Sequence, residues 1–422
     1  MKTTTTLKVV PIKELLPDSV TDQFNRTLRR SPKYPDISVF VDAQGNEYGL
    51  ETVDGKDQMV LLEGDFGLEY RWGVDTNWLG FLPGAQQELL STMLLVESLL
   101  TERQIFVRQD WLGQYSTSIA VDRAAKPAPP ITVDRKLQRK CSDRCIFSPD
   151  KIRVVTPEPR IEHPEAVIFQ DDKGEVISVS NLYPFMYHHF VTVTPDHPAA
   201  ASDFEVRHLM TFLCAGQKLA QIIRDTKDSV GMIGIWNWGE LAAASQGHLH
   251  FQFGGRTPLM ISCATKERKA VDELSQKLKQ DPFSALIDGI RQTSLYCWEN
   301  EAVFVHAPFA PVFPDQIDIV MKENIPNLLE IPDELMAATA EGLWRSLICL
   351  TISRSVTDFN LIIHQDDFEP QSPYYRLHFH IFPRNKRREG GLEFEGTYVV
   401  DIFPETTARA LRQAMGPTKQ GR

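Results

Sequence analysis

The sequence predicts an α+β protein in which one structural unit occurs twice, with an extension before the first copy. The main observation is a recurring order of strand-like, helical and strand-like segments, each copy ending in a His-x-His pair. The 422 residues are also long enough for two or three units with cores of their own. We therefore expect two similar halves packed around mainly antiparallel sheet.

The first 112 residues are the least informative part of the chain. Turns at Gln44–Asn46 and Val53–Gly55 separate strand-like pieces, and Gly84–Glu102 has apolar residues at helical spacing. We expect residues Gly416–Arg422 to fray. The chain is accordingly divided into an N-terminal extension of unknown role (1–112), a first half (113–260), a helical connection (261–300), and a second half with a C-terminal tail (301–422).

The first copy begins with the strand-like segment Pro184–Pro195. A helical run follows, opened by the capping-box pattern Ser202-x-x-Glu205. The apolar stretch Met232–Trp236 and the strand that carries His248 complete the unit.

The second copy repeats this order with the segments Phe309–Val320, Pro332–Ser355, Phe359–His364 and Arg376–Arg384. We match its His380 with His250 of the first copy, 130 residues earlier. Ile381 and Phe382 follow His380, so the second copy lacks a glutamine two residues after that histidine. One catalytic centre is therefore expected, on the first copy.

The segment Asn237–Gln252 contains the candidate catalytic residues. Alternate residues of a strand share a face, so His248, His250 and Gln252 point together while Leu249 and Phe251 turn to the core. Gly247 and the small residues before it let backbone N–H groups approach a phosphate.

A neutral imidazole at His250 can attack phosphorus and form a phosphoramidate, which then passes its nucleotidyl group to a second acceptor. Gln252, Ser245 and Asn237 can donate to phosphoryl oxygens without adding negative charge. The alternative is a strand whose histidines are merely hydrogen-bonded. Two histidines and a glutamine in register, after a small-residue approach, favour the catalytic interpretation.

The same segment resembles the nucleotidyl-transferring branch of the histidine-triad superfamily, with galactose-1-phosphate uridylyltransferase, diadenosine tetraphosphate phosphorylase and GDP-sugar phosphorylases. The signature of that branch is His-x-His-x-Gln. The resemblance implies that His250 is the nucleophile, that Gln252 and Ser245 bind phosphate, and that Asn237 takes the place of an upstream asparagine. Leu249 replaces the proline usual in the uridylyltransferases, and the sequence His-Leu-His-Phe-Gln is closer to that of GDP-sugar phosphorylases.

The resemblance spans residues 113–405 and implies two histidine-triad-like halves. It implies a nucleotidyltransferase that acts on a nucleoside diphosphate sugar or a related nucleotide. The acceptor, a hexose 1-phosphate or inorganic phosphate, stays open, as do the base and the sugar. A nucleotide hydrolase of the same superfamily and a noncatalytic nucleotide-binding sensor are the alternatives.

Three further residues are candidates for substrate binding. The resemblance implies that Arg123, in a basic turn, holds nucleotide phosphates and that Asn181 frames the nucleoside pocket. Arg384 follows the second His pair and can attract a phosphate. For each residue, an ordinary turn or packing role is the alternative.

A zinc site is the second chemical prediction. Zinc accepts thiolates and imidazoles in a tetrahedron, and the resemblance implies a set built from Cys145, His197 and His248. Ser148 occupies the place of the family's second cysteine, and Cys141 is its candidate substitute. A structural zinc and an empty site with free cysteines both stay open. His364, His378 and His380 form another cluster that either binds a metal with a carboxylate or is hydrogen-bonded in the core.

Composition limits the partners. A net charge of −11 disfavours nonspecific binding to nucleic acid. No apolar run resembles a signal core or a membrane span, so we expect a cytoplasmic protein without a membrane partner. Nucleotide sugar, sugar phosphate and inorganic phosphate are the expected ligands, with no organic cofactor; a homodimer is left open.

Overall fold

The computed structural model describes residues 105–120, 145, 147, 151, 168–171, 173–181, 183–384 and 395–415. It also describes the backbone of six short strands in the N-terminal region. These are β1 (Arg29–Arg30), β2 (Phe40–Val41), β3 (Glu47–Val53), β4 (Lys56–Leu61), β5 (Arg71–Val74) and β6 (Glu97–Leu100).

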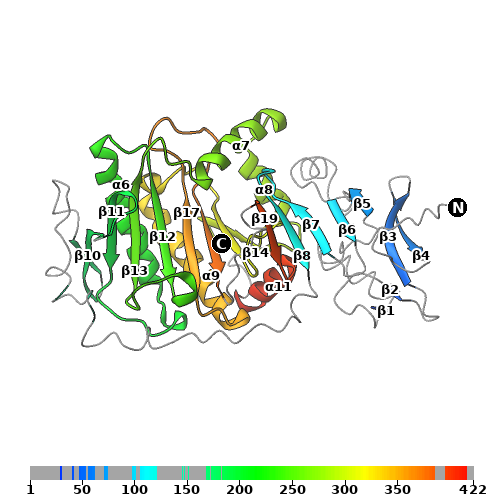
Figure 1. Ribbon diagram of the computed structural model, residues 1–422, viewed down its shortest axis with the longest axis horizontal. Coiled ribbons are helices and arrows are strands. Elements are labelled where there is room, and N and C mark those ends of the chain that lie inside the picture. Colours follow the sequence, from blue (N-terminus) through cyan, green and yellow to red (C-terminus); the bar gives the residue numbers. More distant parts are fainter. Residues whose placement is uncertain are drawn as a thin grey trace.

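A ten-stranded sheet is the largest sheet in the described parts of the chain (Figure 1). Its order is β14-β15-β16-β18-β17-β12-β13-β11-β10-β9, and all of its pairings are antiparallel. Five strands come from each copy, and β12 and β17 meet in the middle. The α+β class and the mainly antiparallel sheet are therefore confirmed.

The first copy contributes β9 (Ile168–Asp171), β10 (Gly174–Ser180), β11 (Tyr187–Val193), α6 (Val206–Thr226), β12 (Gly231–Trp238) and β13 (His250–Arg256). The second contributes β14 (Tyr296–Glu299), β15 (Val303–His306), β16 (Ile317–Met321), α9 (Asp333–Arg354), β17 (Phe359–His364) and β18 (His378–Pro383). The connection between them contains α7 (Cys263–Leu278) and α8 (Pro282–Ile290). The recurring order predicted from the sequence is thus present, while the domain boundaries stay a prediction.

One face of the sheet is covered by α6 and α9, which Figure 1 shows behind the central strands. Phe212 of α6 lies 4.9 Å from Phe251 and 5.4 Å from Phe253, measured between ring centroids. Both strand residues are fully buried. Burial of each such aromatic side chain contributes on the order of 2 to 3 kcal/mol, so the direction of β13 side chains is strongly fixed.

The helix α9 is, among the described residues, the one helix long and apolar enough to cross a membrane. However, 61% of its most apolar stretch is buried inside the protein. This burial is what a core helix shows, and the observation is weak evidence for a membrane span.

Three local predictions are wrong. The helix expected over Gly84–Glu102 is contradicted at its end, where β6 pairs with β5 and Leu99 lies opposite Trp72. The helix expected to open at Ser202 begins instead at Val206, because Asp203 accepts hydrogen bonds from the Ala199 and Ala200 backbone and closes a separate turn.

The third difference concerns the segment 309–316, which was expected to be strand-like. It is an irregular connection, and the strand β16 begins at Ile317. The turns expected before β3 and between β3 and β4 are confirmed by the pairs Val41↔Glu47 and Val53↔Lys56.

A smaller sheet joins distant parts of the chain. β19 (Thr397–Val400) pairs in parallel with β8 (Ser116–Ala120), which pairs with β7 (Ile105–Gln109). The helix α11 (Pro404–Met415) lies beside β19 (Figure 1). The Arg108 guanidinium donates to Glu405 Oε1 at 2.8 Å and to the Phe309 carbonyl at 3.2 Å, and both charged side chains are buried.

We expect Glu405→Gln to lower the free energy of unfolding by about 3 kcal/mol, because the buried Arg108 charge loses its counter-charge. Urea denaturation measures this. The control is Glu341→Gln, which removes a partly exposed ion pair with Arg345 and should cost less than about 0.5 kcal/mol. Equal losses for the two variants would contradict this account of the Arg108 pair.

Candidate active site and metal clusters

The face of β13 opposite α6 carries His250 and Gln252. His250 Nδ1 lies 2.8 Å from the His248 carbonyl oxygen. A carbonyl can only accept, so Nδ1 carries the proton and Nε2 keeps its lone pair. Burial lowers the pKa of His250, which is 5% exposed and therefore neutral near pH 7. The geometry gives the neutral imidazole that nucleophilic attack requires.

Cys145 and Phe147 lie over the same face and pack with Ile177, Val179, Val191 and Val193. The Phe147 ring is 5.4 Å from the His250 ring. Apolar contact on this side excludes water from the imidazole, which raises the strength of polar interactions at its free nitrogen.

His248 uses the opposite tautomer. Its Nε2 lies 2.7 Å from the Thr194 carbonyl oxygen and donates to it, so Nδ1 is unprotonated and lies 3.4 Å from Cys145 Sγ. Burial lowers the pKa of His248 to about 4. A neutral His248 with Nδ1 directed at a thiol is suited to metal binding.

The third member of this cluster is His197. Ligand atoms of Cys145, His197 and His248 all lie within 4.8 Å of one another, and the two imidazole rings are 3.9 Å apart. Within the described parts of the chain, the buried His197 Nε2 has no hydrogen-bond partner. Three of the four predicted metal ligands are thus together, while Cys141 and Ser148 fall outside the described residues.

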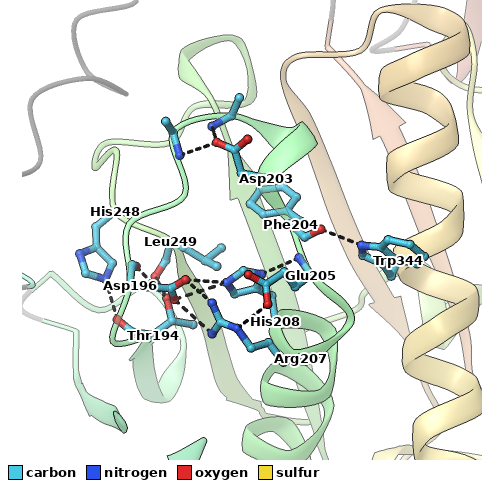
Figure 2. Close-up of polar contacts among 12 residues, drawn as sticks. Thr194, Asp196, Asp203, Phe204, Glu205, Arg207, His208, His248, Leu249 and Trp344 are labelled. Atoms are coloured by element: carbon cyan, nitrogen blue, oxygen red, sulfur yellow. Dashed lines mark hydrogen bonds and ion pairs between the residues drawn. The ribbon is translucent and has the colours of Figure 1, made fainter. Parts of the chain in front are cut away.

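The turn that carries His197 is anchored to α6 (Figure 2). His208 Nδ1 accepts from the Glu205 backbone N–H at 2.9 Å, so its Nε2 donates to Asp196 at 3.0 Å. Arg207 also binds Asp196. Burial would raise the pKa of Asp196, but these two hydrogen bonds outweigh burial and hold it well below its usual range. Sequence reasoning missed Arg207 and His208, which lie on the first turn of α6.

The loop between β12 and β13 is held by the second half of the protein. Asn360 Nδ2 donates to Asn237 Oδ1 at 2.7 Å and to the Ala242 carbonyl at 3.0 Å. Asp358 Oδ2 accepts from the Leu241 N–H at 2.9 Å. The Asn237 amide is thereby oriented, and the loop is fixed before it reaches the exposed Ser245 and the half-buried Gly247.

The remaining predicted residues are placed as follows. Asn181 follows β10, and its Nδ2 lies 3.3 Å from Nε2 of His189 on β11, the strand next to β13. Arg384 follows β18, where its N–H donates to the Asp358 carbonyl at 2.8 Å and its guanidinium lies 4.8 Å from the centre of the Phe313 ring. Arg384 therefore belongs to the second half, next to the residue that holds the first half's loop. Arg123 falls outside the described residues.

The register of the two halves corrects one prediction. Gln252 lies opposite Ile235 in the first half, and His380 lies opposite Ile362 in the second. β13 begins at His250 and β18 begins at His378, 128 positions later. His378 is therefore the counterpart of His250, and His380 stands where the first copy has Gln252. The match of His250 with His380 was wrong by two residues, because the sequence alone did not fix the register.

The second half carries a separate cluster of three imidazoles and one carboxylate. Ligand atoms of Glu267, His364, His378 and His380 lie within 4.8 Å of one another. The Arg376 carbonyl engages His378 Nδ1 at 2.8 Å, and Asp318 engages His380 Nδ1 at 2.8 Å. The Nε2 atoms of both rings are therefore directed inward. Glu267, on α7, is the carboxylate that the sequence did not identify.

The doubled antiparallel sheet is the fold of solved uridylyltransferase-like structures, to which this chain is similar. No protein-family model matches the chain. ADP-glucose phosphorylase from Arabidopsis thaliana is 25% identical over 252 residues, which make up 58% of this chain and 69% of that protein.

Solved structures agree on the fold. A crystal structure of an ADP-glucose phosphorylase from Arabidopsis thaliana with bound ADP-glucose gives a TM-score of 0.61 at 18% identity, covering 74% of this chain and 99% of that chain. A GALT-like protein from Arabidopsis thaliana gives 0.55 at 20% identity, with 64% and 92% covered. A uridylyltransferase gives 0.53 at 21% identity, with 57% and 84% covered. The predicted resemblance is confirmed.

Gly239 marks a close approach that the site depends on. Its φ is +88°, and a Cβ there would lie 2.2 Å from Asp358 Cγ. We expect Gly239→Ala to lower the free energy of unfolding by at least about 2 kcal/mol more than Gly396→Ala. Gly396 also has positive φ (+76°), but no atom of the described residues lies within 4 Å of the added Cβ. Urea denaturation of both variants separates the steric clash with Asp358 from the strain of a positive φ. Equal losses of unfolding free energy in the two variants would contradict the close approach of Asp358 to Gly239.

Proposed function

We propose that this protein is a nucleotidyltransferase that transfers the nucleotidyl group of a nucleotide sugar through a covalent intermediate on His250. The observation that carries the proposal is the His250 tautomer. The His248 carbonyl accepts from Nδ1–H, so the unprotonated Nε2 is available for attack. His250 lies two residues before Gln252 on the same face of β13.

In the first half-reaction, His250 Nε2 bonds to the α-phosphorus and the bond from phosphorus to the bridging oxygen breaks. The sugar 1-phosphate leaves with the electron pair of that bond. The imidazole then carries a positive charge, which the His248 carbonyl stabilises through Nδ1–H. Gln252 and the backbone of the Ser245–Gly247 loop donate to phosphoryl oxygens as charge develops on them.

In the second half-reaction, an oxygen of the acceptor attacks the same phosphorus and the N–P bond breaks, which restores neutral His250. We propose ADP-glucose as the nucleotide sugar and inorganic phosphate as the acceptor, with ADP and glucose 1-phosphate as products. The support is the 25% identity to an ADP-glucose phosphorylase. A hexose 1-phosphate acceptor would make the same chemistry a uridylyltransferase-like exchange.

We expect wild-type protein mixed with α-³²P-labelled ADP-glucose to acquire label in an acid-labile bond, and His250→Ala to acquire none, because no other group takes over the attack. Addition of phosphate should discharge the label as ADP. His188→Asn is the control, since His188 is bonded to Asp228 away from the nucleophile and Asn tolerates its φ of +43°.

Other outcomes have defined meanings. Discharge of the label by water alone at the same rate would favour a hydrolase. Discharge by hexose 1-phosphate but not by phosphate would exclude the phosphorylase proposal. Stabilisation by nucleotides without any labelling would indicate a noncatalytic sensor and would overturn the covalent mechanism.

We further propose that both clusters bind metal ions. A thiolate and two imidazoles at Cys145, His197 and His248 suit zinc, and the unpartnered His197 Nε2 fits a missing ligand. Three imidazoles and a carboxylate at the second cluster suit zinc or iron. A metal on His248 would fix the start of β13, and neither ion takes part in the transfer itself.

Elemental analysis of the purified protein tests this proposal. We expect His197→Asn and His364→Asn each to lose about one equivalent of metal and to unfold at a lower temperature than the wild type. His188→Asn, which lies in neither cluster, should keep the full content. Unchanged metal content in both cluster variants would rule out these sites.

A further inference from the structure

His189 is a buried histidine that the proposed mechanism does not use. It lies on β11, whose pairing with β13 is irregular between Tyr187 and Phe190. His188, inside this irregularity, has a φ of +43°. Such a bulge redirects the side chains around it. Val191 lies directly opposite Gln252, and His189 precedes Val191 by two residues, so both His189 and Gln252 are on the catalytic face.

The contacts of His189 fix its tautomer. Its Nδ1 lies 3.3 Å from the Phe185 backbone nitrogen, whose N–H donates to it. Nδ1 is therefore unprotonated, and the neutral ring carries its proton on Nε2. Burial lowers the pKa of His189, which keeps the ring neutral near pH 7.

Among the described residues, one acceptor lies within reach of the Nε2–H of His189. Gln252 Oε1 lies 3.0 Å away. Asn181 Nδ2 lies 3.3 Å from the same nitrogen, but it is also a donor, because Asn181 Oδ1 accepts from the Tyr183 N–H at 2.9 Å. The hydrogen bond therefore joins His189 to Gln252 and determines which end of the Gln252 amide faces His189.

We propose that His189 is a positioning residue that holds the oxygen of the Gln252 amide and so directs the Gln252 NH₂ group toward the phosphoryl group attacked by His250. Without this bond the amide can rotate by half a turn and present its oxygen to the anion, which is repulsive. The proposal rests on the proposed nucleotidyl transfer, and it assigns a role to a residue that does not itself touch the substrate.

The first test uses an isosteric pair of variants. His189→Gln retains a donor for Gln252 Oε1, whereas His189→Glu offers only acceptors and attracts the Gln252 NH₂ group. We expect single-turnover labelling of His250 by α-³²P-labelled ADP-glucose to stay within about fivefold of wild type in His189→Gln and to fall about 100-fold in His189→Glu. Urea denaturation of each variant verifies that it is folded. If His189→Glu does not fold, His189→Leu replaces it as a variant without a donor, and its labelling is also expected to be slow.

The same variants in a Gln252→Ala background separate positioning from charge. A negative charge at position 189 would repel the phosphates whether or not Gln252 is present. If His189 acts through Gln252, the difference between the Gln and Glu variants disappears in the double variants. A difference of the same size in both backgrounds, or equal rates for the two variants when Gln252 is present, would overturn the proposal.

A second measurement does not depend on activity. In ¹⁵N-histidine-labelled protein, with His189 assigned by comparison with His189→Gln, the imidazole nitrogen shifts should report protonated Nε2 and unprotonated Nδ1. The opposite tautomer would overturn the inference even if the enzyme is active. Absence of any labelling of the wild type would instead count against the proposed function, while the tautomer measurement would still decide the role of His189.

Discussion

The alternation of β13 is the constraint on which the site depends. Phe251 and Phe253 are buried against Phe212 of α6, so a shift of one residue in β13 would move two aromatic rings into the catalytic face and two polar groups into the core. The cost of such a shift is several times the stability of a single hydrogen bond. Apolar packing on one face therefore determines the chemistry on the other.

The imidazoles of His189, His248 and His250 each have one nitrogen engaged by the backbone, and this engagement determines what the other nitrogen can do. The His248 carbonyl leaves His250 Nε2 unprotonated, and the Thr194 carbonyl leaves His248 Nδ1 unprotonated. The Phe185 N–H leaves His189 Nε2 as a donor. Three chemically identical side chains thus present a donor or an acceptor according to backbone groups whose positions the fold already fixes.

Much of this arrangement follows from local sequence. The alternation around His250 predicted its strand and its face, and the apolar run of Pro332–Ser355 predicted α9, because both patterns reflect short-range periodicity. The spacing could not reveal contacts between distant segments. Asp358 and Asn360 hold the loop before His248, and Glu267 completes the second cluster from α7. The register of the halves was also missed, since a repeated His-x-His pattern can be matched two residues out of step without changing its face.

The two halves illustrate how one scaffold supports two kinds of chemistry. Gln252 corresponds to His380, His250 to His378, and Asn237 to His364, because each pair occupies the same place relative to the Ile235–Gln252 or Ile362–His380 pairing. In the first half, the amides of Asn237 and Gln252 stand where the second half has His364 and His380, and Nε2 of His250 is unprotonated. In the second half three imidazoles converge with Glu267, so one ring nitrogen of each faces a common centre. A metal ion in the second cluster would occupy these inward nitrogens, whereas the amides at the two corresponding positions of the first half are poor metal ligands and leave the His250 lone pair available.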